Sequence, residues 1–77
     1  MREPLSKLKK GQGGMISELI IEDIEKRRHL LELGLTKGTE VIVRKIAPIG
    51  GTISILLRGY ELCISKKDAS KILIIVR

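Results

Sequence analysis

Aromatic side chains are almost absent from this chain. Tyr60 is the one residue of the Phe, Trp and Tyr class among 77 residues. Single-stranded nucleic acids are bound by stacking bases on aromatic rings, and proline-rich peptides dock in grooves lined by such rings. The shortage of aromatic rings therefore argues against both kinds of binding module.

Cysteine and long apolar runs are scarce as well. With Cys63 as its one cysteine, the chain cannot form an internal disulfide or a multi-cysteine zinc site, which favours a reducing compartment. No segment approaches the roughly 20 apolar residues that cross a bilayer, and residues 1–10 lack the apolar run of a signal peptide. We expect a cytoplasmic protein with no direct membrane insertion.

What the chain does have is positive charge. Fifteen lysine and arginine residues face nine acidic residues, which gives a formal net charge of +6. Such a balance points to an acidic protein partner, a nucleic acid or an anionic surface. The length fits one small domain over residues 1–77, without repeats or linkers.

A single helix is predicted over residues 22–33. Acidic residues occupy its first turn and basic residues follow, which suits the helix dipole, and Glu22 with Lys26 forms an i,i+4 pair. Ile24 and Leu31 lie on one face. Gly34 then ends the helix in a left-handed conformation, and this cap folds Leu35 back toward it.

Short strands with glycine turns make up most of the remainder. An arm at residues 4–10 precedes Gly11, Gly13 and Gly14, which lack the Gly-Lys-Ser/Thr ending of a phosphate loop. The expected strands cover residues 15–21, 40–47, 52–58, 61–65 and 72–76, and a helical turn capped by Ser65 precedes the last. Turns are expected at residues 36–39, 50–51 and 59–60.

Five strands in so short a chain bury their apolar faces best by curling into a small barrel, which also removes sheet edges. The prediction is therefore a mainly β domain with one α-helix and a helical turn before the last strand. Cys63 lies between Leu62 and Ile64, and we expect a small buried thiol there rather than a nucleophile.

Four segments in this order resemble the ferrous iron transport protein A family: "PLSKLKKGQGG", "RRHLLELGLTKGTEVIV", "APIGG" and "LCISKKDASKILI". The resemblance covers nearly the whole chain. It implies an SH3-like β-barrel, a cytosolic location and a partner, the ferrous iron permease with its cytoplasmic GTP-hydrolysing domain. One departure is visible, because Gly51 and Thr52 stand where the family often has an acidic residue and a proline.

A weaker metal pattern lies on the predicted helix. Glu25, His29 and Glu32 share one face at i, i+4 and i+7. Neighbouring Lys26 and Arg28 oppose a cation, and a surface strip of ion pairs explains the pattern equally well. We expect no tightly bound iron, no cofactor and no catalysis by this chain.

Partner-binding residues are expected at two places. Leu30 and Leu31 point about 100° apart on a helix, so a narrow sheet face cannot bury both. One of them, with Leu35, is expected to form an exposed apolar patch flanked by Arg27 and Lys37. The second place is the turn with Pro48 and Gly50, which is either a plain turn or an interface with the permease or another protomer.

The function predicted from these features is a non-enzymatic accessory or regulatory protein of ferrous iron uptake. It would bind the cytoplasmic GTPase region of the permease, with weak homo-oligomerisation as a further option. The alternatives are a basic SH3-like nucleic-acid-binding or transcription-regulator module, and an iron metallochaperone. The chain resembles the C-terminal domain of some iron-dependent repressors, but no helix-turn-helix precedes it here.

Overall fold

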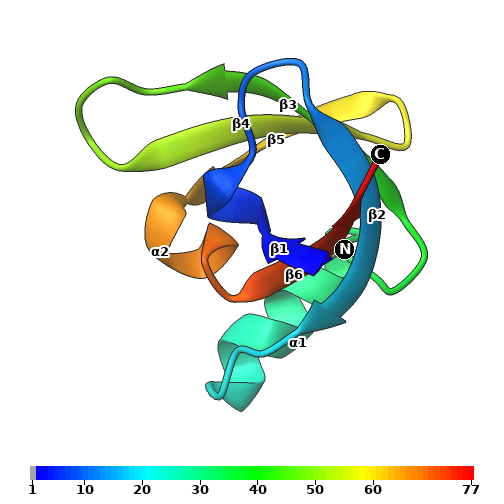
Figure 1. Ribbon diagram of the computed structural model, residues 1–77. Coiled ribbons are helices and arrows are strands. Elements are labelled where there is room, and N and C mark those ends of the chain that lie inside the picture. The colour runs from blue at the N-terminus through cyan, green and yellow to red at the C-terminus, as the bar shows by residue number, and fades with distance from the viewer. Residues whose placement is uncertain (1) are drawn as a thin grey trace.

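A computed structural model describes residues 2–77 and arranges their strands in one antiparallel sheet (Figure 1). The order across the sheet is β1-β6-β2-β3-β4-β5. The elements are β1 (Arg2–Pro4), the 3-10 helix η1 (Leu5–Lys7), β2 (Gly13–Leu19), α1 (Ile24–Glu32), β3 (Glu40–Ile46), β4 (Thr52–Leu57), β5 (Tyr60–Ser65), α2 (Lys66–Ala69) and β6 (Ile72–Val76). The prediction of a mainly β fold is confirmed, with six strands in place of five.

The sixth strand comes just before the segment that was expected to be an arm, and the two share only Pro4. Arg2 to Pro4 pair with Ile75 to Leu73 on β6, and the chain then turns through η1 so that Leu5 and Leu8 enter the core. Three residues give no strand periodicity of their own, which is why the sequence did not reveal this strand.

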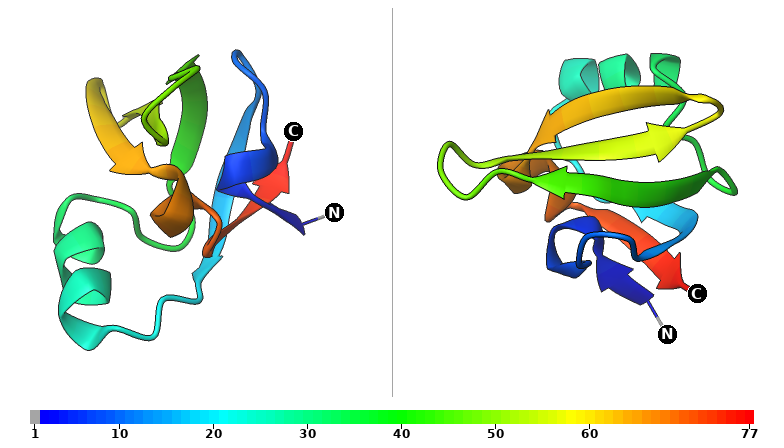
Figure 2. Two further views of the ribbon diagram at one scale, coloured as in Figure 1. Left: turned by 90° about the vertical axis from the view of Figure 1, so that its left-hand side faces the viewer. Right: turned by 90° about the horizontal axis from the view of Figure 1, so that it is seen from above.

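The sheet curls around the core without closing. β1 and β5 remain its two edges, and Figure 2 shows the opening between the two halves of the sheet. Helix α2 contacts both β5 and η1, and η1 contacts β6, so the two short helices lie across this opening. The expected removal of sheet edges was therefore wrong. The edge strands β1 and β5 do not pair with each other, and short helices cover part of the opening between them.

The core is entirely aliphatic. Inward residues alternate with outward ones along β3 and β4, as the period-two patterns predicted, although Ser54 on the outward side of β4 is also buried. The last strand, β6, was expected to be buried throughout, but its Ile75 is 37% exposed. On β3, for example, Val41 and Val43 are buried, whereas Ile42 is exposed. The buried apolar residues are Leu5, Leu8, Ile16, Leu19, Ile21, Leu30, Leu35, Val41, Val43, Ile53, Ile55, Leu57, Ile64, Ala69, Ile72 and Ile74.

Two glycines let β2 lie against both of its neighbours. Gly14 is paired with Val41 of β3 and with Val76 of β6. A Cβ placed on Gly14 would lie 2.1 Å from the carbonyl oxygen of Ile75, and one on Gly13 would lie 2.4 Å from that of Val41. Real Cβ atoms do not approach so closely, so these positions require glycine for packing and not for a turn.

Helix α1 has the C-terminal cap that its sequence predicted, and an N-terminal cap at Asp23, which was expected within the first turn. Asp23 is the N-cap: its Oδ1 accepts from the backbone N–H groups of Glu25 and Lys26, at 3.0 and 3.2 Å. At the other end Gly34 has φ 105°, and the N–H of Leu35 donates to the carbonyl of Leu30 at 3.1 Å. This is the expected Schellman cap, and the helix begins two residues later than expected.

The predicted apolar face of α1 was partly wrong. Leu30 is the one buried residue of the helix, and Leu31 packs only partly against the core. Ile24, expected beside Leu31, is 72% exposed because the helix leaves the sheet toward its N-terminus (Figure 1). Lys26 does not pair with Glu22 as expected; its Nζ lies 3.2 Å from Oδ1 of Asp68 in α2.

The Lys26–Asp68 ion pair is expected to contribute little to stability. The Lys26 side chain is 46% exposed and that of Asp68 is 18% exposed, so solvent still reaches the pair, and pairs screened by solvent contribute about 0.2–1 kcal/mol. A double-mutant cycle with Lys26→Gln and Asp68→Asn, followed by urea unfolding, should give a coupling energy of about 0.5 kcal/mol at low salt. A coupling that stayed the same in about 1 M salt would contradict the exposed-pair interpretation.

The hairpin turn between β4 and β5 lies one residue earlier than predicted. Arg58 and Gly59 both have positive φ, 47° and 84°, which makes them the central pair of a type I′ turn. Tyr60 is therefore the first residue of β5. The first predicted strand, at 15–21, is likewise displaced and becomes β2 at Gly13–Leu19.

Candidate docking surfaces

The exposed apolar patch that was predicted around Leu30 and Leu35 is absent from the structure. Leu30 and Leu35 are 4% and 0% exposed and belong to the core. The Gly34 cap that was predicted to turn the chain also carries Leu35 beneath the end of α1. The proposed exposure of both leucines was wrong, and neither side chain is available to a partner in this fold.

Arg27 and Lys37, which were expected to flank that patch, do lie around one hollow. Arg27 and Lys37 line a depression of about 350 Å³ between α1 and β2. Leu31, half-buried, contributes the apolar surface there. Glu18 also lines the hollow, and its carboxylate lies 3.8 Å from Arg2, so this surface carries charges of both signs.

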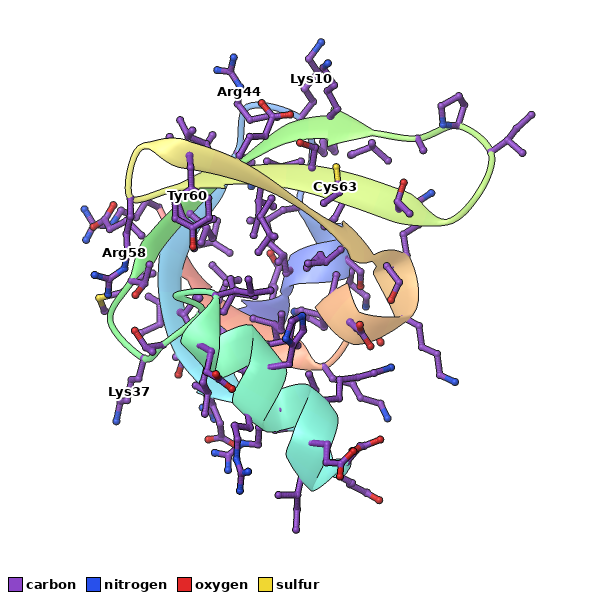
Figure 3. All side chains as sticks on the ribbon, turned by 180° about the vertical axis from the view of Figure 1, so that it is seen from behind. Lys10, Lys37, Arg44, Arg58, Tyr60 and Cys63 are labelled. Atoms are coloured by element: carbon purple, nitrogen blue, oxygen red, sulfur yellow. The ribbon has the colours of Figure 1, made fainter. Side chains whose placement is uncertain are left out.

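A hydrogen-bonded cluster that the sequence did not reveal holds the turn carrying Lys37. The guanidinium of Arg58 donates to the hydroxyls of Thr39 and Thr36, at 3.0 and 3.3 Å, and the two hydroxyls are 2.9 Å apart. The cluster joins the β4–β5 turn to the turn before β3, and Figure 3 shows Arg58 on the same side of the molecule as Lys37. Arg58 is 19 residues from Thr39 and 22 from Thr36 along the chain, so no local pattern indicates that they meet.

The loop between β3 and β4 projects from the sheet (Figure 1). Gly50 and Gly51 have φ 101° and 66°, so the predicted glycine turn is confirmed. Pro48 is exposed, and Ile49 at the tip is 89% exposed. The base of the loop is fixed, because Nζ of Lys66 donates to the carbonyl of Ala47 at 3.1 Å.

Cys63 is exposed, so the expectation of a buried thiol was wrong. Cys63 is paired with Ser54 on the outer face of the sheet, whereas Ile64 points into the core. The thiol lines a hollow of about 410 Å³ together with residues of β3, β4 and the loop. The predicted alternation of Leu62 and Ile64 against Cys63 was correct, and only the expectation that Cys63 is buried as well was wrong.

The metal pattern on α1 does not become a ligand set. Glu25, His29 and Glu32 are all exposed along the helix. Within residues 2–77 no group of three or more His, Cys, Asp or Glu side chains is placed to hold a metal ion. In the same part of the chain, no helix is long and apolar enough to cross a membrane.

The fold and these surfaces define a small SH3-like β-domain whose distinctive features are exposed cations and apolar side chains. The family model for the FeoA domain matches residues 3–76. The chain therefore belongs to the FeoA family, the ferrous iron transport protein A family that its sequence resembles, and this family is associated with ferrous iron transport.

Solved structures agree with this assignment. An iron uptake regulatory protein (FeoA) is 27% identical, with a TM-score of 0.87 over 100% of this chain and 99% of its own. A zinc-complexed FeoA of Stenotrophomonas maltophilia, described as a procaryotic SH3 domain protein, is 21% identical, with a TM-score of 0.76 over 100% and 89%. None of the curated proteins compared with the chain matches it.

The likeness extends to the repressor fold noted from the sequence. A manganese-dependent transcriptional repressor in complex with manganese has a TM-score of 0.92 over 99% of this chain and 37% of its own. Its sequence is only 17% identical, so the match shows a shared fold and nothing of shared function.

Proposed function

We propose that the chain is a non-enzymatic accessory protein of ferrous iron uptake that acts in the cytoplasm by binding the GTPase region of the ferrous iron permease. The observation that carries this proposal is the FeoA match over residues 3–76, which spans nearly the whole chain. Because the family is associated with ferrous iron transport, the permease is the partner that this association favours.

The surface supports association through charge and apolar contact. The net charge is +6, and Arg44 and Lys45 of β3 line hollows that also include the exposed Ile42 and Ile46. Positive charge on one partner speeds encounter with an acidic partner and makes the association sensitive to salt. The permease region that binds this chain is accordingly expected to be acidic at the contact.

A pull-down tests the proposal. The immobilised chain is expected to capture the purified cytoplasmic domain of the permease at about 0.1 M salt and to capture several-fold less at about 0.5 M. Parallel samples without nucleotide, with GDP and with a GTP analogue show whether one nucleotide state is preferred.

Two results would contradict the proposal. If the chain captures the domain in none of the three nucleotide conditions, the permease is not its partner. Specific nanomolar binding of duplex DNA in a gel shift, at physiological salt, would favour the nucleic-acid-binding alternative instead.

A further inference from the structure

Charge is distributed unevenly over this molecule. Residues 4–17 and 41–60 contain no acidic residue, whereas five of the nine acidic residues fall within residues 18–32, on and around α1. The two acid-free segments lie side by side, because the N–H of Gly11 donates to Val43 at 2.8 Å and that of Val43 to Gln12 at 2.9 Å. Figure 3 shows Lys10 and Arg44 at the end of the molecule opposite α1.

A groove runs along β3 at this basic end. It consists of two hollows of about 410 and 280 Å³ that share Lys10 and Lys45. We call their combined lining the β3 groove: Lys10, Gly11, Ile42, Val43, Arg44, Lys45, Ile46, Ala47, Pro48, Thr52, Ser54 and Cys63.

An irregularity in β3 places consecutive cations in the groove. The register with β4 shifts between Val43 and Lys45, so Arg44 is an additional residue at this point of the ladder. A bulge of this kind redirects side chains, and here Arg44 and Lys45 are both exposed. The only ion pairs within residues 2–77 involve Arg2, Lys26 and Arg77, so the groove cations are available to a partner.

Aliphatic side chains lie beside these cations. Ile42 and Ile46, on the groove, are 45% and 40% exposed, and Ile49 extends beyond it at the loop tip. Scattered exposed isoleucines need no explanation, but a cluster with a concave surface and a cationic border has the composition of a docking site.

From this arrangement we infer that the β3 groove binds an acidic, amphipathic segment of the permease's cytoplasmic part. Carboxylates of that segment pair with Lys10, Arg44 and Lys45, and its branched apolar side chains contact Ile46, Pro48 and Ile49. The aliphatic lining favours a protein segment over a nucleic acid, because the phosphates that dominate nucleic-acid binding gain nothing from contact with isoleucine side chains. The inference rests on the proposed function and specifies its contact surface.

Charge-reversal pairs test the cationic border. Lys10→Glu with Lys45→Glu changes the formal charge by four, and so does the control pair Arg28→Glu with Lys67→Glu on α1 and α2. Calorimetric titration with the permease's cytoplasmic domain should show affinity lowered by about 30-fold or more for the groove pair and by less than about threefold for the control. A third pair, Arg27→Glu with Lys37→Glu, reports on the hollow beside α1.

The apolar contact has its own matched control. Ile49→Ser is expected to lower the affinity by about tenfold, the effect of losing one well-packed aliphatic contact. Ile24→Ser removes another highly exposed isoleucine, on α1, with 72% exposure against 89% for Ile49, and should leave the affinity unchanged. Circular dichroism of each variant verifies that it is folded.

Cys63 provides a readout that needs no substitution. As the one thiol of the chain, exposed in the groove, it reports directly on occupancy. A saturating concentration of the permease domain should slow the labelling of Cys63 by a maleimide by about fivefold or more, because a bound partner excludes the reagent and water from the interface.

The outcomes separate the inference from the proposed function. If the wild-type chain does not bind the domain, both fall. If it binds while Cys63 remains reactive and the groove pair binds normally, or if only the Arg27 and Lys37 pair loses affinity, the groove inference is overturned and the proposed function stands.

Discussion

Replacing Gly14 by alanine is expected to remove about half or more of the protein's free energy of unfolding. The new Cβ would lie 2.1 Å from the carbonyl oxygen of Ile75 and 2.7 Å from Cγ2 of Ile74. The nearest atom belongs to the backbone of the neighbouring strand, so no side-chain rotation relieves the overlap. β2 would have to separate from β6 or from β3, and both pairings pass through Gly14.

The size of the effect follows from how little stability a small domain has. Forced displacement in a packed core costs about 1–3 kcal/mol and sometimes more, and we expect about 3 kcal/mol or more here because two ladders are disturbed. Domains of this class have about 5 kcal/mol or somewhat more in total. Urea unfolding followed by circular dichroism should show a midpoint for Gly14→Ala that is lowered by about half or more.

Gly11→Ala serves as the comparison. A Cβ at Gly11 meets no atom within 4 Å, but its φ of 88° is unfavourable for alanine. We expect a loss of about 1 kcal/mol from backbone strain alone, with the fold retained. If Gly14→Ala were no more destabilising than Gly11→Ala, the close packing of β2 against β6 would be wrong.

These glycines illustrate a limit of sequence reasoning. Gly11, Gly13 and Gly14 formed one cluster, and a cluster of glycines is typical of a turn. Only Gly11 has positive φ, whereas Gly13 and Gly14 lie within β2. Their role depends on Val41 and Ile75, which approach from distant parts of the chain. No local pattern carries that information.

Features encoded by neighbouring residues were predicted well. The Gly34 cap, the Ser65 cap of α2 and the glycine turn at Gly50 are all confirmed. Each depends on a few consecutive residues with a defined backbone requirement. The alternation along β3 and β4 was also predictable, because a sheet with one buried face imposes a period of two.

The candidate sites were predicted less well, because sites combine distant segments. Periodicity did not distinguish Leu30 from Leu31, and Cys63 was expected to be buried although it is exposed. The β3 groove joins Lys10 to Lys45 across a bulge that nothing in the sequence marks. Of the loop residues proposed from sequence, Pro48 lines that groove and Gly50 makes its turn.

Leu30→Gln is the second substitution with a large expected effect. Leu30 is 4% exposed and is the one buried residue of α1, so it anchors the helix to the core. Glutamine would bring an amide among Leu35 and other aliphatic residues, where the buried surface offers it no partner. Loss of apolar burial together with a polar group left unsatisfied costs about 2–4 kcal/mol.

The way in which Leu30→Gln loses stability shows whether Leu30 anchors α1 to the core or lies at the surface. Since α1 has no other buried side chain, we expect its amides to lose hydrogen-exchange protection before those of β3 and β4 do. Urea unfolding should give the overall loss, and Ile24→Gln at a 72% exposed position on the same helix should change stability by less than about 0.5 kcal/mol. A Leu30→Gln variant of wild-type stability would instead place this leucine at the surface, where the sequence had suggested a partner binds.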